Sequence, residues 1–247
     1  NDRNYFRLMT LTCLDEIYVL NVKNFKERRK HIQQQLYRLG LEAQFIFDYD
    51  VSDLEEEVTA NFFHYNTELS LPQKSIAMKH VRALELIVER GQRRALVLED
   101  DVILSKNFKV GIEKAVVESY EHPQNQVIFI GCGGNFYTPQ SSRQCGQSLY
   151  INKRGRFADS YIIGTSAASL RLKWITSNKI EKPIDNQFEE IDNEVGITIL
   201  WLEDPVVEQG SKTGIFSTQL EPALPRFIQR LKFFLEKIRR KYIYQMW

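Results

Sequence analysis

The chain has 247 residues, of which 43% are hydrophobic and 26% are charged, and this is the composition of a globular protein. It excludes a disordered, collagen-like or low-complexity chain. The 33 basic and 32 acidic residues nearly cancel, so no overall charge predicts a nucleic-acid partner. Cys13, Cys132 and Cys145 form no C-x-x-C pair, which predicts reduced thiols in a reducing compartment. No apolar run approaches the ~20 residues of a membrane span.

Residues 15–131 alternate between short apolar runs and segments with helical spacing. This alternation predicts an α/β fold, with a Rossmann-like, mostly parallel sheet flanked by helices. Ser52 with Glu55 resembles a capping box and predicts the start of a short helix. We expect strands at 15–22, 43–51, 95–98 and 126–131, and helices at 24–40, 75–91 and 108–120.

The pattern loosens after residue 131, where we expect loops and short strands up to residue 160. Residues 160–175 predict a strand followed by a helix, and residues 197–205 predict a late strand. Between them, Asp185, Glu189 and Asp192 have a spacing that places them on one helical face. A solvated acidic helix is the alternative interpretation of this cluster.

The last 23 residues are basic and amphipathic. Seven basic residues against one acid give residues 225–247 a net charge of +6, while 26 basic and 31 acidic residues leave −5 for the rest. This pattern is typical of a helix lying on an anionic membrane surface. A helix packed on the domain or on a second subunit is the alternative. The helical spacing is carried by Phe227, Leu231, Phe234, Leu235, Ile238 and Tyr242.

The strongest local feature is a buried-strand pattern, Leu96 to Leu98, that runs directly into Glu99, Asp100 and Asp101. In open α/β sheets, ligands bind beyond the carboxyl ends of the strands. Carboxylates crowded at such a place repel one another unless a cation neutralises them. Mg²⁺ or Mn²⁺ suits the pattern, because these ions take one or two protein carboxylates and complete their shell with water and phosphate oxygens. The alternative is that the acids begin a solvated loop.

Seven segments in this order resemble glycosyltransferase family 25, the lipopolysaccharide-type sugar transferases with relatives that galactosylate collagen. The resemblance covers roughly residues 15–220, and it implies a GT-A fold, a UDP-sugar donor, a divalent metal and inversion at the anomeric carbon. The segments are residues 15–22 with Glu27-Arg28-Arg29, Ser75 to His80, Leu96–Val102, Val127–Gly131, Ser160–Ile163, Pro183-Ile184-Asp185, and Pro205–Gln209 with Ser217.

The resemblance also implies roles for single residues. Asp101 and Glu99 are expected at the metal, with Glu99 or Asp100 toward the ribose or a metal-bound water. Asp185 is the first candidate for the catalytic base, followed by Glu189 and Glu190. The residues expected to contact the donor are Asn21, Arg28, His80, Gln209 and Ser217, with a structural histidine and a turn as the respective alternatives for His80 and for the last two.

The predicted protein has a GT-A-like catalytic domain at 1–224 and a basic amphipathic C-terminal helix at 225–247. The predicted reaction moves a hexose, galactose in β linkage, from UDP to a lipooligosaccharide- or lipopolysaccharide-type acceptor at the inner face of the cell membrane. Oligomerisation is left open. The family reads Gly-Cys and Ser-His where this chain has Ser75-Ile76 and Lys79-His80. An inactive relative that binds nucleotide sugar, saccharide or lipid is therefore one alternative, and another metal-dependent phosphoryl enzyme is a further one.

Overall fold

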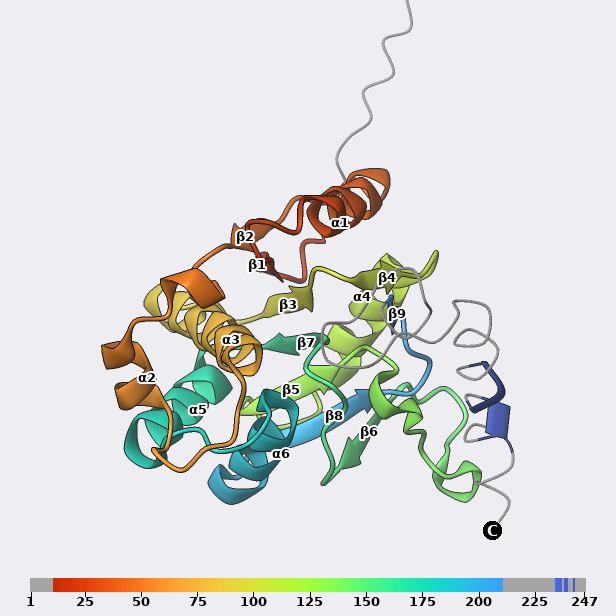
Figure 1. Cartoon of the computed structure of the whole chain (residues 1–247). Helices are drawn as coiled ribbons and strands as arrows, with labels where there is room; N and C mark the ends of the chain where they lie inside the picture. Colours follow the sequence, from red (N-terminus) through yellow and green to blue (C-terminus); the bar gives the residue numbers. More distant parts are fainter. Residues whose placement is uncertain (1–10, 211–233, 237, 240–241, 243–247) are drawn as a thin grey trace, which may run out of the picture.

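The computed structural model describes residues 11–210, 234–236, 238, 239 and 242. Within them, one seven-stranded sheet has the order β2-β1-β3-β7-β5-β8-β6, and helices cover both of its faces (Figure 1). The strands of this sheet are β1 (Glu16–Leu20), β2 (Gln44–Ile46), β3 (Ala95–Glu99), β5 (Gln126–Phe129), β6 (Leu149–Asn152), β7 (Ser160–Ile163) and β8 (Thr198–Leu202).

Five of the seven strands run in one direction, which confirms the predicted mostly parallel α/β sheet. The exceptions are β6, at one edge, and β7, which lies antiparallel between β3 and β5. Ile163 of β7 pairs with Ala95 on one side and with Val127 on the other. The central position in the sheet is therefore filled by β7, which follows both of its neighbours, β3 and β5, in the chain.

Alternation along the strands divides the hydrophobic core into two layers, because successive side chains point to opposite faces of a sheet. Ile17 and Val19 of β1 pack in the layer that contains α1 and α4, whereas Tyr18 and Leu20 pack in the layer that contains α3, α5 and α6. The helices are α1 (Lys26–Arg38), α2 (Glu56–Phe62), α3 (Leu71–Glu89), α4 (Phe108–Ser119), α5 (Thr165–Asn178) and α6 (Ile184–Val195).

The capping box was predicted at the wrong position. Ser52 lies in a 3-10 turn, Val51–Asp53, and α2 begins at Glu56 without a side-chain cap. The box forms instead at Ser70, whose backbone N–H donates to Gln73 Oε1 at 2.9 Å. Both motifs have an acceptor side chain three residues after the serine, but Ser70 directly precedes the long apolar face of α3, so α3 begins at Leu71 rather than at 75.

A second, two-stranded sheet joins the acid motif to the end of the body. β4 (Val102–Leu104) pairs with β9 (Val207–Gln209), and Val102 lies opposite Gln209. The Gly210 N–H donates to the carbonyl oxygen of Asp101 at 2.7 Å. This pairing brings two segments of the chain that are more than a hundred residues apart to the same corner.

Most of the predicted C-terminal helix, and all of Ser217 and its surroundings, lie outside the described residues. Of that stretch, residues 234–236 and 238 are helical, and Phe234, Leu235, Ile238 and Tyr242 are exposed. Among the described helices, none combines the length and the apolar character needed to cross a membrane.

Candidate functional site

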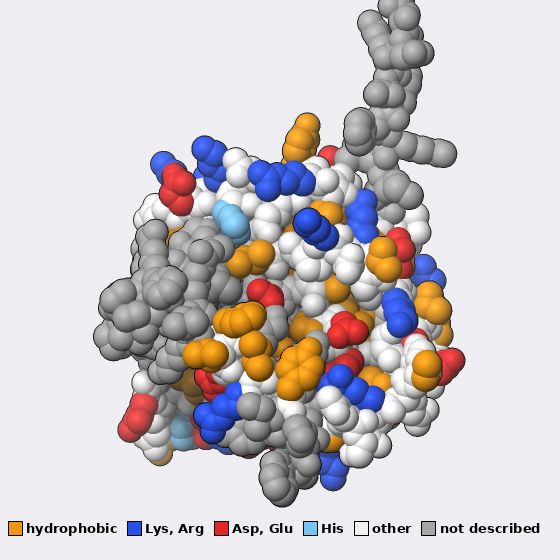
Figure 2. Space-filling model, turned by 90° about the vertical axis from the view of Figure 1, so that its right-hand side faces the viewer, with side chains coloured by type: hydrophobic (Ala, Val, Ile, Leu, Met, Phe, Trp, Pro, Cys, Tyr) orange, Lys and Arg blue, Asp and Glu red, His pale blue; other side chains and the backbone are white. Residues whose placement is uncertain are grey.

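The acid motif lies where β3 ends. Glu99 is the last residue of the strand, and Asp100 and Asp101 form the turn before β4. Asp100 and Asp101 are only 5% and 3% exposed, and the Glu99 side chain keeps 22% of its surface accessible. On the face of the molecule to which the parallel strands point, acidic side chains gather near the centre among hydrophobic and basic ones (Figure 2). The motif is thus partly enclosed, rather than the start of a solvated loop.

Two neighbours predicted from the sequence meet the motif. Asn21, which directly follows β1, donates from Nδ2 to Asp100 Oδ2 at 2.6 Å. Arg28, on α1, donates from Nη1 to Asp100 Oδ1 at 3.2 Å, and the same nitrogen lies 3.9 Å from Asp101 Oδ2. Because β1 and β3 are adjacent and parallel, their ends place these groups at one corner. The corner combines carboxylates with an amide and a guanidinium.

Burial and neighbouring carboxylates raise the affinity of Glu99 and Asp100 for protons. Burial raises the pKa of Glu99 well above its usual value, and the charges of Asp101, Asp185, Asp159 and Asp100 raise it further. Burial also raises the pKa of Asp100, although Arg28 and Asn21 oppose this shift. A cation placed among these groups would favour their charged forms.

The residues fit a divalent ion that shares its shell with a ligand. No three histidine, cysteine or acidic side chains of the described residues converge on one point, so an all-protein cage is not formed there. However, Asp101 Oδ1 is buried and has no hydrogen-bond partner within the described part of the chain. Mg²⁺ and Mn²⁺ are commonly held by one or two carboxylates plus phosphate oxygens and water, and Asp101 with Glu99 meets that requirement.

His80 lies beneath the motif, in the layer of α3. Its Nδ1 is 3.0 Å from the Tyr161 hydroxyl, and its Nε2 is 3.8 Å from Glu99 Oε1. Complete burial, with a contribution from the charge of Arg171, lowers the pKa of His80 to about 3. His80 is therefore neutral at physiological pH and lies next to Glu99 on the interior side of the sheet.

The acids of α6 separate into different environments. Asp185 Oδ1 accepts a hydrogen bond from the Ala158 N–H at 2.7 Å, and its charge acts on Glu99. Glu189 Oε2 accepts from the Gly155 N–H at 2.9 Å. Both carboxylates therefore hold the segment that precedes β7, and Asp185 is the one whose charge reaches the acid motif.

Two further acids of α6 make ion pairs away from the motif. Glu190 is exposed, and its Oε2 lies 2.9 Å from Lys182 Nζ. Asp192 is fully buried and receives two hydrogen bonds from Arg171, at 2.7 and 2.6 Å. The helical spacing was a sound basis for grouping the acids, but it does not distinguish a reactive carboxylate from a structural one.

Asp159 belongs to the site and was not predicted. It immediately precedes β7 and is almost completely buried, and its backbone carbonyl accepts a hydrogen bond from the Glu99 N–H at 2.9 Å. Its Oδ1 accepts from the Ser160 hydroxyl at 2.7 Å. Gly131 lies against the pair, since a Cβ there would be 2.4 Å from Ser160 Oγ and 2.5 Å from Asp159 Oδ1. A lone aspartate before a strand has no distinguishing pattern, and only the pairing of β7 with β3 reveals it.

The late segment reaches the same corner through β9. Gln209 of β9 pairs with Val102 of β4, and Val102 directly follows Asp101 in the chain. Within the described residues its Oε1 is buried without a hydrogen-bond partner. The expected roles of Gln209 and of Ser217 toward the donor both stay predictions.

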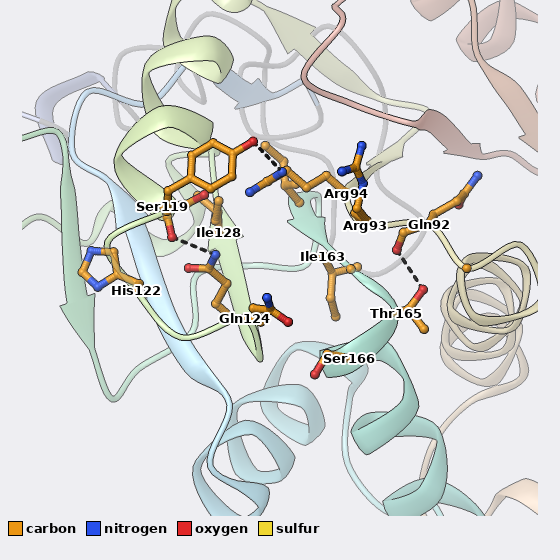
Figure 3. Close-up of a pocket in the computed structure, with 15 residues that line it drawn as sticks. Gln92, Arg93, Arg94, Ser119, His122, Gln124, Ile128, Ile163, Thr165 and Ser166 are labelled. Carbon is orange, nitrogen blue, oxygen red and sulfur yellow. Dashed lines mark hydrogen bonds between the residues drawn. The ribbon is translucent and has the colours of Figure 1, made fainter.

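A separate cavity of about 400 Å³ opens at the other edge of the sheet, where β3 and β5 begin and β7 ends (Figure 3). Arg93, Arg94 and His122 are among its lining residues, together with Ser166 in the first turn of α5. None of the residues predicted for the site lines this cavity.

Sequence comparison identifies the family of the chain. A model of glycosyltransferase family 25 (LPS biosynthesis protein) matches residues 14–187, a stretch that runs from β1 into α6 and contains the acid motif and Asp185. No curated protein sequence matches the chain significantly.

Among solved structures, the chain is similar to the inositol-1-phosphate CTP transferase from T. maritima, at 10% identity and a TM-score of 0.39 over 91% of this chain and 77% of that one. A likeness this distant carries no argument about function. The family match covers well over half of the chain, and the protein therefore belongs to glycosyltransferase family 25, the glycosyltransferases of lipopolysaccharide biosynthesis.

Proposed function

We propose that the protein transfers a hexose, galactose in β linkage, from a UDP-sugar to a lipooligosaccharide- or lipopolysaccharide-type saccharide, with inversion at the anomeric carbon. The observation that carries this proposal is the partly enclosed corner at the end of β3, where Asp101 lies beside Arg28 and Glu99 is within electrostatic reach of Asp185. It supplies a place for a charged diphosphate and, next to it, a carboxylate able to take a proton.

On the donor side, Asp101 and Glu99 would hold a divalent ion, Mn²⁺ or Mg²⁺. When bound, this ion supplies Lewis-acid stabilisation of the charge that develops on the leaving diphosphate. Arg28 would offer its guanidinium to the same phosphates, and Asn21 and Asp100 would orient the nucleoside. Arg28 is already held by Asp100, so its position does not depend on the ligand.

On the acceptor side, Asp185 takes the proton of the attacking hydroxyl. General-base assistance of this kind typically contributes ~10²–10⁴-fold to the rate. The Ala158 N–H fixes one oxygen of Asp185, which orients the carboxylate at the first turn of α6. Glu189 and Glu190 are the next candidates. Glu190 is exposed and paired with Lys182, and of the three acids Asp185 is the one whose charge acts on Glu99, which makes Asp185 the preferred base.

The departures from the family pattern in α3 have a structural explanation. Lys79 is buried, with Nζ 2.7 Å from Asp50 Oδ1 and 2.6 Å from the Asp48 carbonyl oxygen. Ser75 donates to the Tyr49 carbonyl oxygen at 2.6 Å. These bonds hold the loop after β2 and involve no residue of the acid motif. The substitutions in α3 therefore favour an active enzyme over an inactive relative.

The decisive measurement is the release of UDP from UDP-galactose, with and without a deacylated lipooligosaccharide acceptor and Mn²⁺. Acceptor- and metal-dependent release with formation of a β-linked product supports the proposal. Binding of UDP with metal but without turnover would instead identify an inactive relative, and release of inorganic phosphate without sugar transfer would identify a phosphoryl enzyme.

The basic tail fits an enzyme whose acceptor is anchored in a membrane. Residues 225–247 carry a net charge of +6, and the described apolar side chains among them, Phe234, Leu235, Ile238 and Tyr242, are exposed. We expect the full-length protein to sediment with anionic vesicles at low salt and a chain ending at 224 to remain in solution. Equal sedimentation of both proteins would contradict the membrane role of the tail.

A further inference from the structure

His80 is enclosed in the core layer between the sheet and the helices α3, α5 and α6. The residue has no exposed surface, and its ring is stacked on that of Tyr161 in β7, with 5.8 Å between the ring centres. The ring of Phe188, from α6, makes a T-shaped contact with the imidazole at 5.7 Å. Because bulk water does not reach the imidazole, its two nitrogens depend on protein groups for their partners.

The two ring nitrogens of His80 face two different groups. Nδ1 is 3.0 Å from the Tyr161 hydroxyl. Nε2 is 3.8 Å from Glu99 Oε1 and has no hydrogen-bond partner within the described part of the chain. A separation of 3.8 Å is longer than a hydrogen bond, so the group that Nε2 presents to Glu99 acts on it electrostatically.

The Tyr161 hydroxyl can determine what Nε2 presents. A neutral imidazole carries a proton on one nitrogen and a lone pair on the other, and the hydrogen bond made by one nitrogen sets the state of the other. If the hydroxyl donates to Nδ1, the proton is on Nε2 and the N–H attracts the Glu99 carboxylate. In the opposite tautomer a lone pair faces the acid and repels its charged form. The first arrangement is the one that suits a carboxylate required to bind a cation.

We propose that Tyr161 is a positioning residue of the donor site. By donating its hydroxyl proton to His80 Nδ1, it fixes the imidazole with Nε2–H toward Glu99, and this N–H holds one oxygen of Glu99 so that the other stays available to the divalent ion. The inference rests on the proposed function, in which Glu99 and Asp101 share that ion. Contacts of this kind are often long in the absence of ligand and shorten in the loaded site.

The first test determines the tautomer of His80 directly. Proton–nitrogen NMR correlation spectra of the parent, with His80 assigned by its absence in His80→Gln, should show the proton on Nε2 alone. In Tyr161→Phe, which removes only the hydroxyl, we expect the Nδ1–H tautomer to appear beside the other. A proton on Nδ1 in the parent, or the same tautomer state in parent and variant, would overturn the proposal. This measurement needs neither metal nor substrate.

The second test measures the affinity for Mn²⁺ with UDP present, by EPR of the free ion and without turnover. Removing a group that orients a metal ligand typically costs about 10–100-fold in metal affinity. We expect about 10-fold weaker binding in His80→Leu and, because one tautomer still presents the N–H, about 5-fold in Tyr161→Phe.

His80→Gln separates positioning from packing. Its amide offers an oxygen to the Tyr161 hydroxyl and an N–H to Glu99, so its Mn²⁺ affinity should stay within about 3-fold of that of the parent. Glutamine and leucine both lose the ring stacking on Tyr161. Equal losses of affinity in these two variants would therefore show that packing alone is at work and would contradict the positioning role.

Tyr18→Phe is the matched control for Tyr161→Phe. Tyr18 is equally buried and packs in the same core layer, but its hydroxyl donates to Gln92 Oε1 at 3.0 Å, away from the acid motif. This variant should lose stability and keep the Mn²⁺ affinity of the parent. The same affinity in both phenylalanine variants would overturn the proposal. A parent that binds no Mn²⁺ would count against the proposed function, and the tautomer spectra would then decide the role of Tyr161 alone.

Discussion

The two edges of the central sheet differ in both charge and shape. At the carboxyl edge, Glu99, Asp100, Asp101, Asp159 and Asp185 interact electrostatically in a partly enclosed corner. At the amino edge, the 400 Å³ cavity is lined by arginines and by no carboxylate of the described residues. This cavity is thus not the place where the predicted residues meet. Parallel strands direct their carboxyl ends, and the loops that follow them, to one side of the sheet, and the candidate site follows that rule rather than the volume of a cavity.

Asp101→Asn should have the largest effect and tests whether the carboxyl edge carries the reaction. Losing the charge at the expected metal ligand should lower kcat/KM for UDP-galactose by about 1,000-fold, since Lewis-acid assistance is worth several kcal/mol and each 1.4 kcal/mol is about tenfold. Steady-state kinetics over a range of Mn²⁺ concentrations gives the measurement. Arg93→Gln, at the amino edge, is the control and should remain within about 2-fold. Similar losses in both variants would remove the distinction between the edges.

Asp185→Asn should have the next largest effect. Asparagine retains an oxygen that can accept the Ala158 N–H, so the segment before β7 should stay in place while the base is lost. We expect kcat to fall by about 100-fold, the lower part of the general-base range, with little change in the KM for the donor. Glu190→Gln, which removes an exposed ion pair with Lys182, should leave kcat unchanged. Full activity of the asparagine variant would assign the base elsewhere.

His80→Gln should have a smaller effect, on stability rather than on a reaction step. The pKa of His80 is about 3 in the folded protein against about 6.5 for an unperturbed histidine, so the unfolded state binds more protons between these values. The buried neutral His80 therefore contributes fully to the free energy of unfolding above pH 6.5. This contribution is lost as the pH falls from 6.5 toward 3, by up to about 1.4 kcal/mol per pH unit.

Denaturant unfolding at pH 7 and pH 5 measures this contribution. The parent should lose about 2 kcal/mol more than His80→Gln between the two pH values. His122→Gln, beside the amino-edge cavity, is the matched control and should behave like the parent. The same pH dependence in the parent and in His80→Gln would show that the buried imidazole does not set the acid sensitivity.

The elements near the acid motif were predictable because their signals are local. The apolar run at Leu96–Leu98 predicts a buried strand, and the acids that follow it must lie at the end of that strand. The places of Asn21 and Arg28 follow from β1 being parallel to β3, although the hydrogen bonds to Asp100 required the structure. Helical spacing likewise located the acids of α6.

What the sequence did not show depends on contacts between distant segments. The antiparallel insertion of β7 has no local signal, and with it the place of Asp159 beside Glu99 was missed. The role of the buried Arg156 in joining three chain segments was missed for the same reason, because the three carbonyl oxygens that its guanidinium binds come from separate parts of the chain. A pattern of side chains reports periodicity, whereas strand order is decided by how the finished layers pack.

The position of β7 also constrains how the chain acquires its structure during synthesis. While the ribosome has made only the first hundred residues, β2, β1 and β3 can associate, but the outer side of β3 has no strand beside it until Ser160–Ile163 emerge. An uncovered strand edge invites pairing with other nascent chains. Between the synthesis of Glu99 and that of Ser160, this edge of β3 is therefore open to pairing with other chains.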